Sequence, residues 1–206
     1  MNALCAKHGL YHINDEAYEY FTYDGARHFS PASIPGASDH TISLYSMSKA
    51  YGFASWRIGW MVFPAELEPA LLKVQDTLII CPPVIAQYAA LGAMREGRPF
   101  VQEKVHALAQ TRAMVKRELS KLEQVGLAEI PPAAGALYFL VRLRSQLKPL
   151  DYVARLIREH GVAAIPGDAF GLTQGCSLRI AYGALDPETA VEGIGRLVAG
   201  VQAIGA

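Results

Sequence analysis

The chain has 206 residues, which is enough for one large domain or two small ones, and its 19 basic residues balance its 19 acidic residues. A formal net charge of zero gives no electrostatic case for a nucleic acid or an anionic membrane as a partner. No apolar run reaches the roughly 18–20 residues of a spanning helix, and the first ten residues do not resemble a signal peptide. The three cysteines are far apart in the sequence, which argues against a disulfide framework. We therefore expect a reduced, cytoplasmic protein.

Short apolar segments alternate with helical patterns along the first half of the chain. The expected elements are strands at residues 10–15, 41–46 and 57–63 and helices at residues 64–79 and 85–97. The first strand, LYHIND, is typical of a buried parallel strand, because its short apolar run ends at an acid. Lys49 therefore lies on the connection between two strands.

The second half begins with a long amphipathic helix, in which every inward position except Arg112 is apolar. The residues that recur every three or four positions on one face of this helix are Val105, Leu108, Arg112, Val115, Leu119 and Leu122. The elements expected after it are strands at 136–143, 162–166 and 177–183 and helices at 152–161 and from Pro187. We therefore predict an α/β fold: a partial, mainly parallel sheet with helices over residues 1–99, followed by a smaller α+β domain over residues 100–206.

The segment SLYSMSKAYGFASWRIGW (residues 43–60) places Lys49 among hydroxyl and aromatic residues. We expect Lys49 to be buried on its short loop, which would favour the uncharged, nucleophilic amine that Schiff-base chemistry needs. Ser46 and Ser48 offer hydroxyls, and Arg57 offers a planar fork that can hold a phosphate. An amine for an aldehyde beside donors for a phosphate fits pyridoxal phosphate. The alternative is a surface loop whose lysine and arginine are simply solvated.

The segment D-E-A-Y, from Asp15 to Tyr18, follows the first strand directly. A buried carboxylate beside a pyridine nitrogen keeps that nitrogen protonated, which the cofactor needs to accept electrons. The carboxyl end of a strand in an open α/β sheet is also where ligands bind. Tyr18 could donate to the phenolic oxygen of the cofactor. The alternative for Asp15 is the N-cap of a helix.

The pattern S-x-S-K-x7-R-x-G, from Ser46 to Gly59, resembles the lysine motif of the class I/II aminotransferases, which are pyridoxal-phosphate enzymes of fold type I. The D-E-A-Y segment resembles the acidic motif of that family. The small-domain signatures of the family are similar to G-A-L-Y-F (135–139), P-G-D-A-F-G (166–171) and S-L-R-I-A-Y (177–182). The motifs occur in the family's order and extend over nearly the whole chain.

The resemblance implies a role for each matching residue. Lys49 would hold the cofactor as a Schiff base and then move a proton between the substrate Cα and the cofactor. The binding roles fall on Asp15 for the pyridine nitrogen, Tyr18 for the 3-oxygen, Ser46 and Arg57 for the phosphate, and Arg179 for the substrate α-carboxylate. Ser48 is a further cofactor-binding residue. The implied reaction moves an amino group from an amino acid to a 2-oxo acid, in a homodimer.

Other activities share these motifs, so alternatives stay open. A pyridoxal-phosphate lyase of the same fold, an inactive aminotransferase-like fragment and an effector-sensing regulatory domain are the alternatives. No arginine occurs in VQDTLIIC (74–81) before the Pro-Pro pair, which favours apolar, aromatic or alanine-like amino donors over dicarboxylates. His8 and His12 suggest a metal site only weakly, because Gly9 interrupts the helix that their spacing requires.

Two features depart from the family pattern. Ser55 stands where the family usually has a glycine, and we expect a positive φ at that position at some cost. The glycine turn, stacking aromatic and N-P-containing segment of the family's N-terminal half are absent here. We therefore expect the chain to be the C-terminal part of an aminotransferase, with low turnover by itself.

Overall fold

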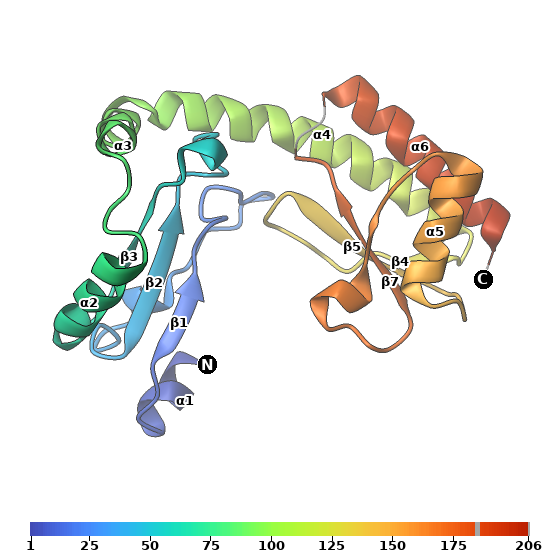
Figure 1. The fold of residues 1–206 in the computed structure, drawn as a ribbon. Coiled ribbons are helices and arrows are strands. Elements are labelled where there is room, and N and C mark those ends of the chain that lie inside the picture. The colour runs from blue at the N-terminus through green and yellow to red at the C-terminus, as the bar shows by residue number, and fades with distance from the viewer. Residues whose placement is uncertain (184–185, 206) are drawn as a thin grey trace. The chain divides into compact units, whose positions relative to one another are not determined.

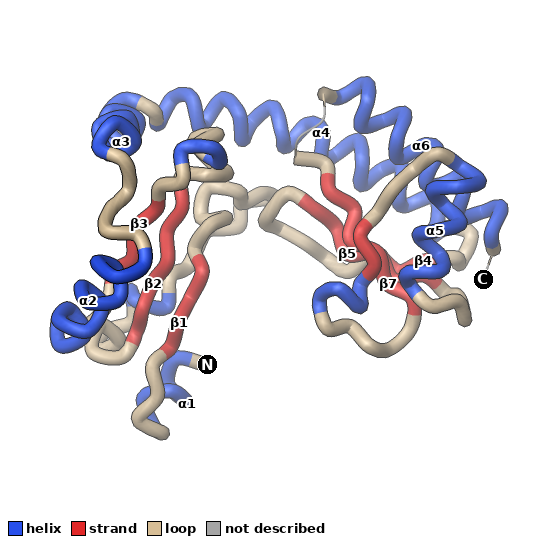
Figure 2. Tube along the Cα trace, in the orientation of Figure 1, coloured by secondary structure: helices blue, strands red, loops and turns tan. Residues whose placement is uncertain are grey.

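The computed structural model describes residues 1–183 and 186–205. The chain divides into two compact units, Met1–Val105 and His106–Ala206. Each unit carries its own sheet, with strand order β1-β2-β3 in the first and β4-β5-β7-β6 in the second. All strands of the two sheets except β6 are labelled in Figure 1, and strands are red in Figure 2.

The first unit confirms the three strands and two helices expected from its sequence. Its elements are α1 (Asn2–Lys7), β1 (His12–Asp15), β2 (Thr41–Ser46), β3 (Gly59–Val62), α2 (Glu68–Leu78) and α3 (Val84–Glu96), with 3-10 turns at Pro31–Ser33, Ala54–Trp56 and Ala65–Leu67. β1 runs parallel to β2 and β3 runs antiparallel to it. The first strand was predicted parallel, and that is confirmed.

The expectation that β1 is buried is wrong in this chain. Half-buried and exposed residues alternate along β1, every residue of β3 is exposed, and Ile13 is 63% exposed. The exposed residues of β1, Ile13 and Asp15, share one face of the sheet, and β1 is an edge strand that pairs only with β2 among the described residues. Exposed apolar side chains such as Ile13 are unusual for an isolated soluble unit.

The second unit is an antiparallel sheet packed against helices. Its elements are most of α4 (Arg98–Gln124), then β4 (Ala128–Glu129), β5 (Tyr138–Leu143), α5 (Pro149–His160), β6 (Ile165–Pro166), a 3-10 turn at Gly167–Phe170, β7 (Cys176–Ala181) and α6 (Pro187–Ile204). The strand expected at 162–166 shrinks to the last two of those residues, because only they pair with β7. No helix in the described parts of the chain combines the length and apolarity that crossing a membrane requires.

Successive side chains of the strands point to alternate faces of the second sheet, and the core of this unit lies on one of those faces. Phe139 and Val141 of β5 and Leu178 and Ile180 of β7 are buried in the cluster formed with α4, α5 and α6. Their strand neighbours face the other way, since successive side chains of a strand point to opposite faces. Arg179 therefore lies on the face opposite to the helices.

Arg112 interrupts the apolar stripe of α4 because its guanidinium has its own partners. The side chain is buried, Nη2 donates to the Ala133 carbonyl, and the charged carbon lies 5.7 Å from the centre of the Phe139 ring. Burying a cation is tolerable when it is hydrogen-bonded in this way. The charge thus ties α4 to the segment that leads into β5.

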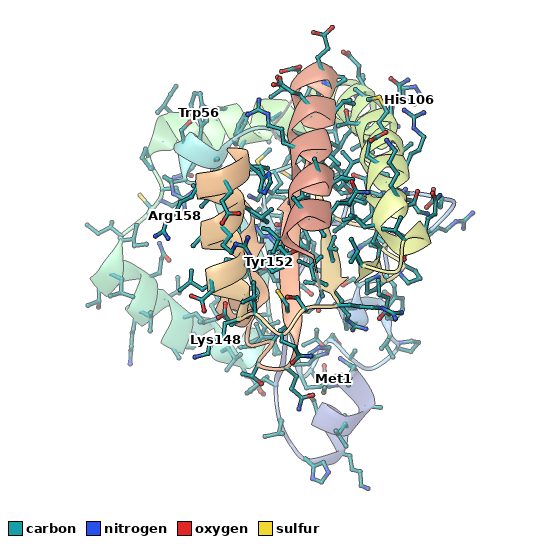
Figure 3. All side chains as sticks on the ribbon, turned by 90° about the vertical axis from the view of Figure 1, so that its right-hand side faces the viewer. Met1, Trp56, His106, Lys148, Tyr152 and Arg158 are labelled. Carbon is teal, nitrogen blue, oxygen red and sulfur yellow. The ribbon has the colours of Figure 1, made fainter. Side chains whose placement is uncertain are left out.

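Close contact between α5 and α6 completes the core of this unit. Tyr152 of α5, labelled in Figure 3, is fully buried, and its hydroxyl donates to the Val201 carbonyl of α6 at 3.4 Å. Burial raises the pKa of the Tyr152 hydroxyl to about 12. Gly200 lets the helices approach, because a Cβ there would lie 2.8 Å from Leu156 Cδ2 and 2.9 Å from the His160 ring.

Two alanine substitutions on α6 should therefore act in opposite directions. Gly193→Ala places its Cβ in open space, and we expect it to raise the free energy of unfolding by about 0.5–1 kcal/mol through helix propensity. Gly200→Ala should lower it by about 1–3 kcal/mol, because buried neighbours must move. Urea unfolding measures both, and equal stabilisation by the two changes would contradict the close contact.

Candidate functional site

The parallel pairing of β1 with β2 brings two sequence motifs to one edge of the first sheet. In the register of the pair, Asp15 lies opposite Leu44, and the amide of Glu16 donates to the Leu44 carbonyl at 2.8 Å. The D-E-A-Y turn leaves the carboxyl end of β1, and the lysine loop leaves the carboxyl end of β2 at Ser46. This edge is the ligand-binding position of open α/β sheets.

The lysine loop is held by the residues on either side of Lys49. Met47 and Ala50 are buried, and the Met47 carbonyl accepts from the amides of Tyr51 at 3.3 Å and Phe53 at 3.2 Å. Lys49 itself is exposed, so the expectation of a buried lysine is wrong for this chain. The turn aims the two flanking side chains inward and leaves the amine outside.

Ser46 and Gly59 form the narrow base of this loop. The Ser46 Oγ accepts from the Ser48 amide at 3.1 Å, which closes a tight turn directly before Lys49. Ser46 pairs with Gly59 across β2 and β3. A Cβ at Gly59 would lie 2.5 Å from the Tyr45 carbonyl oxygen, so only glycine allows this approach.

Backbone strain in the motif falls on Arg57 and not on Ser55. Arg57 has φ 53° and ψ 49°, in the left-handed region, whereas Ser55 lies within the 3-10 turn Ala54–Trp56 and has no positive φ. The expectation of a positive φ at Ser55 is therefore wrong. The exposed Arg57 donates from Nη1 to the Ala54 carbonyl at 2.8 Å. A left-handed non-glycine residue costs about 1–2 kcal/mol and often marks a functional position.

Asp15 and Tyr18 lie on the neighbouring turn. Asp15 is exposed rather than buried, and its Oδ1 accepts from the Ala17 amide at 3.0 Å. No helix follows, so Asp15 caps a turn and the helix N-cap alternative is also wrong. Tyr18 is half-buried, and its ring meets that of Phe21 edge-on at 6.2 Å.

Tyrosines that the sequence reasoning missed connect the two loops. The Tyr20 and Tyr51 hydroxyls are 3.2 Å apart, and their rings pack edge-on with centres 5.7 Å apart. Burial, followed by the hydrogen bond to Tyr51, raises the pKa of the Tyr20 hydroxyl. Each tyrosine lies two residues beyond a proposed site residue, Tyr18 or Lys49, and that proximity was the available signal.

In the second unit, two aromatic rings surround Arg179. Its guanidinium carbon lies 4.6 Å from the centre of the Tyr138 ring and 4.7 Å from the centre of the Phe170 ring. Its buried Nε has no hydrogen-bond partner among the described residues. Tyr138, Phe170 and Arg179 come from the three small-domain signatures, so the structure brings those signatures together around one cation.

Close backbone approach explains the position of Phe170. A Cβ at Gly167 would lie 2.7 Å from the Ser177 Cβ, so glycine lets the turn that carries Phe170 rest against β7. Cys176 lies at the start of that strand and is buried. Burial, with a smaller contribution from Asp168, raises the pKa of the Cys176 thiol to about 11, which makes it a poor nucleophile.

The weak metal hypothesis gains no support from the N-terminal histidines. His12 Nδ1 lies 3.1 Å from the side-chain amide nitrogen of Asn2, which also donates to the Thr41 hydroxyl at 2.8 Å. Among the described residues, no three His, Cys, Asp or Glu side chains gather as a metal site would require. His12 belongs to a polar contact between α1 and the sheet.

These features define an α/β protein with an exposed lysine loop at the edge of the sheet of its first unit and, in its second unit, an arginine enclosed by aromatic rings. The chain matches the family described as aminotransferase class I and II over residues 1–197. It therefore belongs to that family.

Individual members of the family are also similar to this chain over most of its length. The chain is 33% identical to the aromatic aminotransferase ISS1 of Arabidopsis thaliana over 97% of this chain and 49% of that protein. It is 33% identical to the arginine–pyruvate transaminase AruH of Pseudomonas aeruginosa over 86% of this chain and 44% of that protein. The solved aromatic aminotransferase of Pyrococcus horikoshii superposes with a TM-score of 0.90 at 30% identity, over 98% of this chain and 54% of that one.

The chain thus spans about half the length of the relatives it matches. Membership of the family implies pyridoxal phosphate as cofactor, and the donor set at the sheet edge fits that group: an amine, a carboxylate, two hydroxyls and a guanidinium on adjoining loops. An amine suits an aldehyde, a carboxylate suits a ring N–H, and the guanidinium suits a phosphate.

The base of the lysine loop should not tolerate a side chain at Gly59. We expect Gly59→Ala to lower the free energy of unfolding by about 1–3 kcal/mol, because its Cβ would collide with the backbone of β2. Gly92→Ala in α3 meets nothing within 4 Å and serves as the control. Urea unfolding compares the two, and hydrogen exchange reports opening between β2 and β3. Equal stability of the variants would count against the close approach.

Proposed function

We propose that this chain carries the lysine and substrate-carboxylate sites of a pyridoxal-phosphate-dependent aminotransferase, which moves an amino group from an amino acid to a 2-oxo acid. The observation that supports this most strongly is the meeting of Lys49, Ser46 and Asp15 at the carboxyl edge of one parallel strand pair. An apolar or aromatic amino donor fits the lack of arginine in residues 74–81.

Each of the residues proposed to hold the cofactor on the lysine loop has its own role. When bound, pyridoxal phosphate supplies an aldehyde and an electron-accepting ring. Lys49 presents the amine, while the hydroxyls of Ser46 and Ser48 and the guanidinium of Arg57 bind the phosphate. Lys49 also holds and moves a proton at the substrate Cα, since a primary amine on a short loop can act as a general base. The strained backbone of Arg57 sets the direction in which its side chain leaves the loop.

The D-E-A-Y turn is proposed to bind the pyridine ring. The Asp15 carboxylate accepts the ring N–H and so keeps that nitrogen charged. Tyr18 donates its hydroxyl to the 3-oxygen. Because the Asp15 Oδ1 already accepts from the Ala17 amide, Oδ2 is the oxygen that we assign to the ring.

Arg179 is proposed to bind the substrate α-carboxylate. The rings of Tyr138 and Phe170 restrict the planar guanidinium, so less side-chain entropy is lost when a carboxylate binds its fork. It lies on the face of the sheet opposite to the helical core, and its buried Nε has no hydrogen-bond partner among the described residues. A bidentate pair would fix the orientation of the amino acid.

A homodimer is part of the proposal for the whole protein. Large apolar side chains on α3 are exposed, among them Ile85 at 69% and Tyr88 at 69%. Exposed apolar surface of this kind is typical of protein interfaces. Sedimentation of the protein at several concentrations tests this part of the proposal.

Lys49 should be the preferred target of pyridoxal phosphate. After incubation and borohydride reduction, peptide mapping should place most of the label on Lys49 rather than on Lys73, an exposed lysine of α2. The reason is that only Lys49 has phosphate donors beside it. Lys49→Arg should abolish the site-specific label. Equal labelling of the two lysines would refute the assignment of the lysine site.

Arg179 should bind carboxylates by its fork and not by charge alone. We expect Arg179→Lys to weaken binding of a 2-oxo acid about tenfold, because an ammonium cannot replace two parallel hydrogen bonds. Arg142→Lys on the neighbouring strand is the matched control, since Arg142 is exposed and pairs with Glu129. Calorimetric titration measures both. A loss of the same size in the control variant would show that the effect is general charge.

A further inference from the structure

The most deeply buried acid of the first unit is not one of the residues to which the proposed function assigns a role. The Glu16 side chain is fully buried, directly after the exposed Asp15. Its Oε1 accepts from the Ser30 hydroxyl at 2.6 Å and lies 3.5 Å from the Ser43 hydroxyl. Its Oε2 lies 2.7 Å from His28 Nε2, in a contact that becomes an ion pair when His28 is protonated but is not aligned as a hydrogen bond.

Burial of this carboxylate requires compensation. Removing a charge from water costs several kcal/mol unless hydrogen bonds and opposite charge replace the solvent. The partners of Glu16 come from segments far apart in the sequence, since Ser43 lies in β2 and His28 and Ser30 lie on the connection between the strands. The carboxylate therefore ties the end of β1 to both segments.

Glu16 also interacts electrostatically with Glu19 on the same turn. Glu19 is half-buried, and burial raises the pKa of its carboxyl group, with His28 lowering it and Glu16 raising it further. The described acidic and basic groups that interact here are thus Glu16, Glu19 and His28. The turn therefore places the buried Glu16 carboxylate on the side that faces the sheet and the exposed Asp15 on the other side.

Neighbouring residues on an extended chain point to opposite sides. A fixed Glu16 therefore fixes the direction of Asp15. The backbone supports the same arrangement, because the Glu16 amide donates to Leu44 and the Glu19 amide donates to the Glu16 carbonyl at 2.9 Å. Tyr18 lies between these two anchored positions.

We propose that Glu16 is a positioning residue for the cofactor site: its buried carboxylate, held by Ser30 and His28, fixes the turn from which Asp15 and Tyr18 face the pyridine ring. This rests on the proposed function. Glu16 itself does not touch the cofactor and acts only through its neighbours.

The first test needs no cofactor. Hydrogen exchange is compared between the wild-type chain and Glu16→Gln, which keeps the size of the side chain and loses its charge. We expect the amides of Ala17 and Glu19 to exchange about tenfold faster or more, because hydrogen bonds to a charged group are stronger than those to a neutral amide. Ser30→Ala should act in the same direction. Glu19→Gln, on the same turn, is the control and should leave the Ala17 amide slow. Unchanged exchange in Glu16→Gln would overturn the proposal.

The second test separates positioning from general support of the fold. Retention of pyridoxal phosphate is measured for Glu16→Gln, Asp15→Asn and the double variant. If Glu16 acts through Asp15, Glu16→Gln weakens retention about tenfold in the wild-type background and has little further effect beside Asp15→Asn. Equal weakening in both backgrounds overturns the proposal and leaves the proposed function standing. A wild-type chain that retains no pyridoxal phosphate refutes the proposed function, and with it the role of Glu16 toward the cofactor.

Discussion

The parallel hydrogen bonding between β1 and β2 is the constraint on which the candidate site depends. Parallel strands end at the same edge of a sheet, so residues 15–18 and 46–59, which are distant in the sequence, leave that edge together. The register is fixed by the pairing of Asp15 with Leu44. A shift of one residue would exchange the exposed Asp15 with the buried Glu16. The side chain available to a ligand is therefore set by the pairing of the strands.

The charged side chains of the two units differ in the kind of partner they have, and that difference separates support from binding. Glu16 and Arg112 each have hydrogen bonds that join distant segments, so both hold the chain together. Arg179 differs, because the faces of two aromatic rings enclose its guanidinium. A cation held against ring faces keeps its N–H donors for an anion, which favours a ligand over a structural role.

Sequence reasoning succeeded where a local pattern decides the structure. The strand at 41–46 and the helices at 64–79 and 85–97 follow from apolar spacing and from prolines, and β2, α2 and α3 occupy those segments with ends shifted by a few residues. The motif residues also fell at strand ends as expected. Arg112 was recognised as an exception in its stripe, but its partner Ala133 could not be found, because that contact depends on the tertiary fold.

Sequence reasoning failed where the environment of a residue is set by other parts of the fold. Lys49 and Asp15 were expected to be buried because they follow apolar strands, yet burial depends on the layer that covers a sheet and not on the strand itself. The positive φ was assigned to Ser55 from the family pattern, whereas the turn places it at Arg57. Glu16 was passed over because no local feature distinguishes a structural acid from a catalytic one beside it.

Placement and environment of the site residues are therefore separate properties of this chain. The position of Lys49 follows from contacts inside the first unit: the buried Met47, the Ser46 turn and the close approach at Gly59. Its exposure follows from the turn, which buries the flanking Met47 and Ala50 and leaves Lys49 outside. A covering segment would change the solvation of the amine, and with it the nucleophilicity, without having to move the loop. The strained Arg57 supports this view, because a left-handed residue persists only where its surroundings already determine the turn.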